Sequence, residues 1–136
     1  MKSTVEWKSG LAFTAHQGNH DLALDAPKES GGQDSGASPK GLLLSGLGGC
    51  TGVDVVSILD KMRVTLDGFA VEVSAELTEE HPKVFSAIHL RYVFRGRELV
   101  REKLEKAVVL SMDRYCGVSA MLAKAAPITW EIVIEG

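Results

Sequence analysis

Apolar and polar residues alternate through the first 25 residues of the chain, the period expected of half-buried β-strands. The turn-forming pairs Ser9-Gly10 and Gly18-Asn19 divide this region into three short segments. The apolar members are Val5, Trp7, Leu11, Phe13, Ala15, Leu22 and Leu24. The pattern predicts a three-stranded antiparallel meander.

A different pattern begins at Ser38, a good helix N-cap, followed by Pro39, which suits the first helical position. Apolar side chains then point in nearly every direction around a 3.6-residue period up to Met62, which predicts a central core helix buried on most sides. They are Leu42, Leu43, Leu44, Leu47, Val53, Val55, Val56, Ile58 and Leu59. Ser45, Asp54 and five glycines interrupt the run, which argues against a membrane span.

Residues 26–38, between the meander and this helix, have no apolar periodicity and are rich in Gly and Ser. Loops of this length inside a domain are usually functional or disordered. Because this loop leads into the central helix, we expect it to lie over a site there.

The rest of the chain alternates between the two periods. Residues 69–77 and 88–94 predict a strand hairpin, residues 97–112 an amphipathic helix, residues 118–124 a short helix, and residues 128–134 a last strand. The order is three strands, a helix, two strands, two helices and one strand. It predicts a single α+β domain over residues 1–136, with antiparallel sheets and segregated helices.

Small residues form a stripe along the central helix, where glycine would otherwise be costly. Gly41, Ser45, Gly48 and Gly52 are spaced four, three and four apart, so another backbone can approach that face. Cys50 lies beside the stripe. We therefore regard Cys50 as the first residue to test for chemistry.

Composition narrows the function classes. The 136 residues carry a net charge of −3 and no basic stripe, which argues against a nucleic-acid partner. The N-terminus lacks the apolar region of a secretory signal, so we expect a cytoplasmic protein with no membrane partner. In that compartment, two cysteines predict reactive thiols or inert core residues and not a permanent structural disulfide.

The two cysteines, Cys50 and Cys116, are each predicted in or at the start of a helix and could approach each other across the small-residue stripe. A thiol becomes a good nucleophile when a cation, a helix N-terminus or a hydrogen-bond donor lowers its pKa. A break of the helix at Gly48 and Gly49 would supply such a terminus at Cys50. The alternative is that both cysteines are small buried hydrophobic residues.

Other chemistries find less support in the sequence. The four histidines His16, His20, His81 and His89 lack the spacing of a metal site, so we expect no metal. No glycine-rich nucleotide fingerprint follows a strand, and we expect no cofactor. Neither Ser45 nor Ser57 lies in a GxSxG elbow. Asp54 is expected to be a helix-surface or interhelix hydrogen-bonding residue, because a carboxylate opposes thiolate formation.

Two motifs together resemble the OsmC/Ohr family of osmotically induced and organic-hydroperoxide-resistance proteins. They are Ser-Pro with Gly-Gly-Cys-Thr-Gly-Val-Asp-Val-Val-Ser-Ile-Leu around Cys50, and Tyr-Cys-Gly-Val-Ser-Ala-Met-Leu around Cys116. The order of elements agrees over nearly the whole chain, and the likeness is greatest to the branch of OsmC-like proteins with YhfA-type members. The resemblance implies an intertwined homodimer whose sheets wrap around a buried central helix.

The resemblance also implies a thiol peroxidase. Cys50 would attack an organic hydroperoxide and become a sulfenic acid, Cys116 would condense with it, and an external dithiol would reduce the disulfide. The peroxidase members place an arginine in the preceding loop and a glutamate after the Ser-Pro start. Here that loop contains no arginine, and Lys28 is its only basic residue. The residue after Pro39 is Lys40 and not a glutamate, and Arg114 is a further candidate cation. The alternative function is a non-catalytic dimer that binds a small apolar or thiol-reactive ligand.

Overall fold

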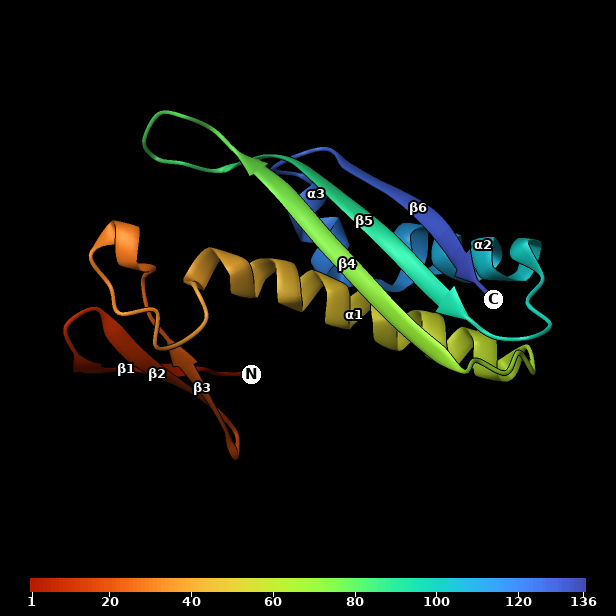
Figure 1. The fold of residues 1–136 in the computed structure, drawn as a ribbon, viewed down its shortest axis with the longest axis horizontal. Helices are drawn as coiled ribbons and strands as arrows, with labels where there is room; N and C mark the ends of the chain where they lie inside the picture. The colour runs from red at the N-terminus through yellow and green to blue at the C-terminus, as the bar shows by residue number, and fades with distance from the viewer. The chain divides into compact units, whose positions relative to one another are not determined.

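The computed structural model describes residues 1–136, which divide into two compact units, Met1–Leu43 and Leu44–Gly136. A single domain over the whole chain stays a prediction. The elements in chain order (Figure 1) are β1 (Thr4–Ser9), β2 (Ala12–Gln17), β3 (His20–Leu24), the 3-10 helix η1 (Lys28–Ser30), α1 (Pro39–Lys61), β4 (Gly68–Leu77), β5 (Phe85–Arg95), α2 (Arg101–Leu110), the π-helical segment η2 (Ser111–Tyr115), α3 (Gly117–Ala123) and β6 (Ile128–Glu135).

The first unit contains the predicted meander, an antiparallel sheet in the order β1-β2-β3. Gly10 and Gly18 adopt positive φ at the two turns, as a tight hairpin requires. Most of this sheet is exposed within the chain, and Ala15 and Leu24 are its buried apolar side chains. The meander prediction is confirmed.

The loop after β3 is organised by one carboxylate for which the sequence pattern gives no signal. Asp25 is 3% exposed and accepts hydrogen bonds from the backbone N–H groups of Ala26, Gln33 and Ser35 and from the Ser35 hydroxyl. Donors from Ser35, then from Ala26 and Gln33, lower the pKa of this carboxyl against the opposing effect of burial. A bridge between Leu24 and Ala37 closes the loop at its base.

Helix α1 begins where the sequence predicts, because the Ser38 hydroxyl accepts a hydrogen bond from the Gly41 N–H at 3.2 Å. The helix continues without a break to Lys61, through Gly48 and Gly49. By length and composition alone it could cross a membrane. A buried core helix also satisfies those criteria.

Within this chain α1 is buried along one face and not on most sides, which differs from the prediction. Leu47, Thr51, Val55 and Leu59 follow one another at four-residue spacing and are each at most 1% exposed. Val53, on another face, is 71% exposed. The all-round apolar pattern is therefore only partly explained by the packing that one copy of the chain provides.

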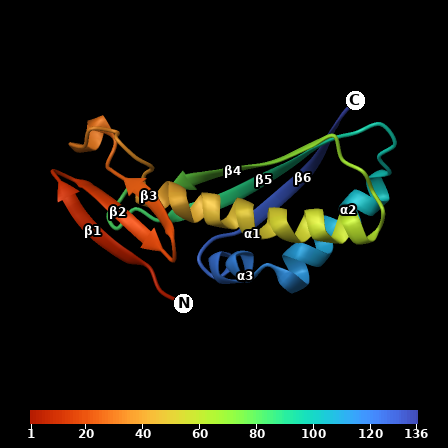
Figure 2. The same ribbon diagram turned by 90° about the horizontal axis from the view of Figure 1, so that it is seen from below.

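The second unit contains a sheet in the order β4-β5-β6, with α1, α2 and α3 on one face (Figure 2). Strands β4 and β5 form the predicted antiparallel hairpin, but β6 runs parallel to β5. The expectation of purely antiparallel sheets was wrong here. The chain returns through α2, η2 and α3 to the end of the sheet where β5 starts, and such a crossover joins parallel strands. The α+β class and the element order are confirmed.

The core of this unit lies between the sheet and the helices. It combines the buried face of α1 with inward side chains of β5 and α2, including Leu90, Tyr92 and Leu104, each 0% exposed. A Cβ added to Gly48 would come within 3.1 Å of a Val73 methyl group. The small-residue stripe therefore lets α1 lie close against β4, as expected.

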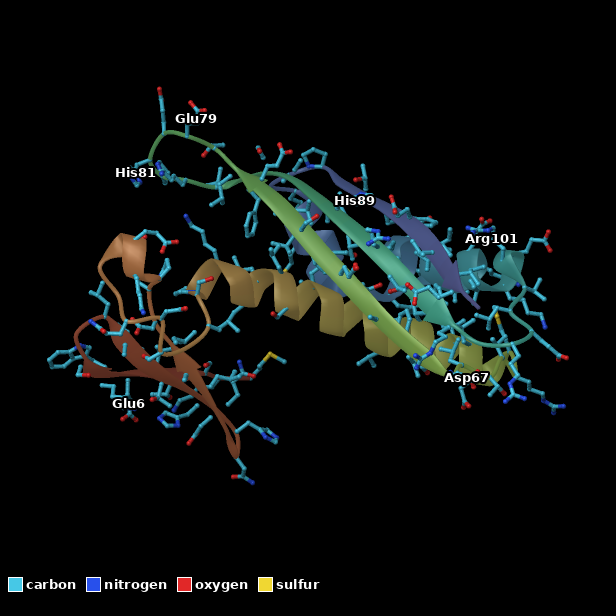
Figure 3. All side chains as sticks on the ribbon, viewed as in Figure 1. Glu6, Asp67, Glu79, His81, His89 and Arg101 are labelled. Carbon is cyan, nitrogen blue, oxygen red and sulfur yellow. The ribbon has the colours of Figure 1, made fainter.

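The opposite face of the sheet is polar. His89 points from this face (Figure 3) and contacts the Thr129 hydroxyl at 2.7 Å and Glu131 at 3.1 Å. Arg91 donates hydrogen bonds to Glu72 and Glu131. Hydrogen bonds from Arg91 and then from His89 lower the pKa of Glu131. These exposed pairs explain the polar half of the strand pattern.

Candidate functional site

Both cysteines belong to the second unit and both are free thiols. Cys50 lies in the middle of α1 and is half-buried, in contact with the edge of the core. Cys116 lies between η2 and α3, is 3% exposed and forms part of the core. The two side chains therefore differ in their access to a dissolved reagent.

The structure brings the two thiols next to each other. Burial raises the pKa of the Cys116 thiol, the Ser119 backbone N–H opposes that increase, and the adjacent Cys50 thiol raises the pKa further. The groups that act most strongly on Cys116 include no cation. Cys116 is thus a protonated thiol at neutral pH with a second thiol beside it.

Local hydrogen bonds fix Cys116 at the start of α3. Its sulfur accepts a hydrogen bond from the Ser119 N–H at 3.4 Å, which makes it the N-cap, and the Ser119 hydroxyl donates to the Cys116 carbonyl at 2.9 Å. The Cys116 N–H donates to the Ser111 carbonyl at 2.7 Å, across the π-helical segment η2. π-Helical turns of this kind often occur at functional sites.

A chain of buried hydroxyl groups lies beside the two cysteines. Tyr92 and Thr51 are 2.8 Å apart between their side-chain oxygens, and Thr51 and Ser111 are 2.7 Å apart. The Ser111 hydroxyl donates to the Asp54 carboxylate at 2.8 Å. Thr51, Tyr92 and Ser111 are each 0% exposed, and no buried side-chain polar atom lacks a partner.

Tyr92 is at one end of this chain of hydroxyl groups, and the Asp54 carboxylate is at the other. Burial raises the pKa of Tyr92 to about 12, the hydrogen bond with Thr51 opposes the increase, and the nearby Cys116 and Asp54 side chains add to it. The phenol is therefore neutral at physiological pH. That Cys116 acts on Tyr92 also places the hydroxyl chain close to the thiols.

Of these four residues, only Asp54 was singled out from the sequence, as a hydrogen-bonding residue. Its bond with Ser111 on the neighbouring segment confirms that interpretation. Thr51 and Ser111 gave no signal of their own, since isolated hydroxyl residues are common in helices. Their relation arises from the packing of α1 on η2, which joins positions 51 and 111 across the core.

Of the three candidate cations, Arg114 belongs to the same unit as the thiols, and Lys28 and Lys40 belong to the first unit. The Arg114 guanidinium lies over the ring of the exposed Tyr115, 5.9 Å from its centroid, and makes no hydrogen bond with either sulfur. Because α1 is unbroken at Gly48 and Gly49, no helix N-terminus forms at Cys50. No three His, Cys, Asp or Glu side chains are grouped as metal ligands.

A surface hollow of about 630 Å³ lies between α1 and α2 on the side of Asp54. Its apolar walls include Ile58, Met62 and Leu110, and Lys61 and Lys106 also line it. Asp54 therefore joins the buried hydroxyl chain to this open surface.

Comparison with known proteins gives a consistent result. The family model described as OsmC-like protein matches residues 32–131. Protein YhfA of Escherichia coli strain K12 is 38% identical over 136 residues, covering 98% of each chain. A crystal structure of a hypothetical protein from Aquifex aeolicus has a TM-score of 0.83 and 31% identity, and covers 99% of this chain and 97% of that one.

The same fold occurs in an organic hydroperoxide resistance protein OsmC from Legionella pneumophila. That structure has a TM-score of 0.73 and 16% identity, over 98% of this chain and 97% of that one. At this identity the likeness concerns the fold alone. From the family model and the relatives above 30% identity, the chain belongs to the family of OsmC-like proteins.

Proposed function

We propose that this protein reduces organic hydroperoxides through its two cysteines, with Cys50 as the peroxidatic residue and Cys116 as the resolving one. The observation that carries the proposal is the pairing of a half-buried thiol with a buried, protonated one beside it. The description of the Legionella neighbour as an organic hydroperoxide resistance protein supports a redox role.

The reaction balances with one external co-reactant. The Cys50 thiolate attacks the distal oxygen of the hydroperoxide, the O–O bond breaks, and the alkoxide leaves as the alcohol after taking a proton. The Cys116 sulfur then attacks the Cys50 sulfenic acid, which releases water and forms a disulfide. An external dithiol reduces that disulfide by exchange and is itself oxidised to a disulfide.

The assignment of the two roles follows from access and protonation. A peroxide reaches Cys50 more readily, because Cys116 is 3% exposed. Burial and the neighbouring Cys50 thiol both oppose ionisation of Cys116, which suits a residue that reacts second. Cys116 then needs to reach only a sulfur that is already beside it.

We further propose that the active protein is a homodimer. Val53 and Val56 on α1, and Val5 and Trp7 on β1, are large apolar side chains that remain 47% to 71% exposed in one copy of the chain. A second copy would cover apolar side chains of this kind and account for the all-round apolar pattern of α1. Sedimentation equilibrium should give twice the 14.6 kDa chain mass, and a monomer at all concentrations would contradict the proposal.

A second candidate function is a non-catalytic dimer that binds a small apolar or thiol-reactive ligand. The observation in its favour is that residues 26–38 contain no arginine and that the unbroken helix α1 supplies no helix N-terminus at Cys50. A thiol without a nearby cation or helix N-terminus is a weaker nucleophile at neutral pH. The location in the cytoplasm and the lack of nucleic-acid and membrane partners stay predictions.

Peroxide consumption by the reduced protein distinguishes the two functions. With dithiothreitol as the dithiol, cumene hydroperoxide should disappear faster than hydrogen peroxide and much faster than with dithiothreitol alone. Cys50→Ser should abolish the reaction. Cys116→Ser is the matched control, and it should consume about one equivalent of peroxide rapidly before turnover slows. A wild-type rate equal to that of free thiol would contradict the peroxidase proposal.

A further inference from the structure

The hydroxyl chain beside the cysteines has a single possible direction. An ionised carboxylate only accepts hydrogen bonds, so the one hydroxyl hydrogen of Ser111 is committed to Asp54. Ser111 must then accept from Thr51, and Thr51 must accept from Tyr92. The order of donation is Tyr92 to Thr51 to Ser111 to Asp54, and it leaves no hydroxyl hydrogen of the chain unused.

Each cysteine is one step away from this chain. Thr51 follows Cys50 directly in α1, so its side chain and that of Cys50 leave the same turn of one rigid helix. Ser111 holds Cys116 through the 2.7 Å hydrogen bond between its carbonyl and the Cys116 N–H. The 2.7 Å contact between Thr51 and Ser111 therefore ties together the two backbone segments that carry the sulfurs.

The segment that bears Cys116 needs such a tie. It lies between a π-helical turn and a helix of seven residues, and neither is a long regular element with its own strong hydrogen-bonding pattern. A disulfide forms only when the two Cα atoms approach within about 7 Å with suitable side-chain directions. A small shift of this segment away from α1 would therefore lower the effective concentration of one thiol at the other.

We infer that Thr51 and Ser111 are positioning residues that hold Cys116 against Cys50, anchored at one end by the Asp54 carboxylate and at the other by Tyr92. The chain acts through the backbone and touches neither peroxide nor reductant. This inference rests on the proposed two-cysteine function, because it concerns the formation of the Cys50–Cys116 disulfide. It gives a role to four residues besides the two cysteines.

The test is the equilibrium between the Cys50–Cys116 disulfide and glutathione, measured by alkylation and mass spectrometry in buffers of defined glutathione ratio. Thr51→Val removes the hydroxyl at nearly constant volume. It should lower the equilibrium constant for disulfide formation about ten-fold, because Tyr92 and Ser111 lose their shared hydrogen-bond partner and the segment that carries Cys116 is no longer held against α1. Thr51→Ser restores the hydroxyl and should return the constant to within about two-fold of the wild-type value.

A stability control separates positioning from general loosening. Leu104 lies in the first half of α2, and Ser111 follows the end of that helix. Leu104→Ala removes buried apolar contacts and leaves the chain of hydroxyl groups intact. It should lower the stability to unfolding at least as much as Thr51→Val and leave the disulfide equilibrium within about two-fold. If Thr51→Val does not fold, Ser111→Ala takes its place and should give the same loss.

The outcomes are distinct. If the wild type forms the disulfide and Thr51→Val forms it with the same equilibrium constant, the positioning role is wrong and the two-cysteine function stands. If Leu104→Ala lowers the constant as much as Thr51→Val, the effect is one of stability and the positioning role is also wrong. If the wild type forms no Cys50–Cys116 disulfide at any glutathione ratio, the proposed function fails and the inference with it.

Discussion

Replacement of Tyr92 by phenylalanine tests whether the buried phenol is held as a neutral hydrogen-bond donor. Burial raises the pKa of Tyr92 from 10.0 to about 12, so its neutral form is favoured by the fold. This contribution to stability is fully present below pH 10, the pKa of the tyrosine in the unfolded chain, and is lost as pH rises towards 12. Linkage gives a loss of about 1.4 kcal/mol per pH unit, or roughly 2 to 3 kcal/mol in all.

Tyr92→Phe should change the pH dependence in a defined way. At neutral pH the variant loses the hydrogen bond with Thr51 and should be less stable than the wild type by about 1 kcal/mol. It has no phenol to ionise, so it should escape the loss above pH 10. The two curves of unfolding free energy against pH should therefore cross at about pH 11.

Urea unfolding at intervals from pH 8 to pH 11.5 measures both curves. Tyr115→Phe is the matched control, because Tyr115 is 57% exposed and makes no side-chain hydrogen bond in the structure. It should follow the wild-type curve across the range. Parallel curves for Tyr92→Phe and the wild type, with no crossing, would refute the account of a buried neutral phenol.

Two further predictions concern the core and the loop. Val108→Ala should lower the free energy of unfolding by about 2 kcal/mol, because Val108 is 0% exposed. Val109→Ala should change it by at most about 0.5 kcal/mol, because Val109 is 42% exposed. Equal losses in urea unfolding would contradict the assignment of the buried and exposed faces of α2. Asp25→Asn should speed amide hydrogen exchange over residues 26–37, and Asp34→Asn in the same loop should not. Because the pKa of Asp25 is lowered, the wild-type loop should keep its protection from amide exchange at neutral pH and lose it only as pH falls through that lowered pKa. Unchanged amide exchange in Asp25→Asn would contradict the role of this carboxylate.

Local sequence signals predict much of this fold. The strand alternation, the turn residues at Gly10 and Gly18, and the Ser38-Pro39 start of α1 each act within a few residues, and each is found as expected. The direction of β6 could not be inferred in the same way. It depends on the end of the sheet to which the chain returns after α3, and the alternation of β6 itself is the same for parallel and antiparallel pairing.

The candidate site divides along the same line. Cysteine is rare in this chain, so Cys50 and Cys116 were conspicuous in the sequence. Thr51, Tyr92 and Ser111 were not, because a hydroxyl becomes informative only when distant segments bring it to a partner. The exposed faces of α1 could not be predicted from the pattern either. A helix with apolar residues on all sides is expected to be buried on most sides, and one copy of the chain buries a single face of α1.

The central claim is that Cys50 and Cys116 react as a pair, and peptide mapping after stoichiometric oxidation tests it most directly. The reduced protein is treated with one equivalent of cumene hydroperoxide, alkylated and digested. The account predicts a linked peptide pair containing Cys50 and Cys116, with a mass lower by two hydrogens than the sum of the reduced peptides. Recovery of Cys116 as the alkylated free thiol, with Cys50 unmodified or oxidised without a link, would contradict it.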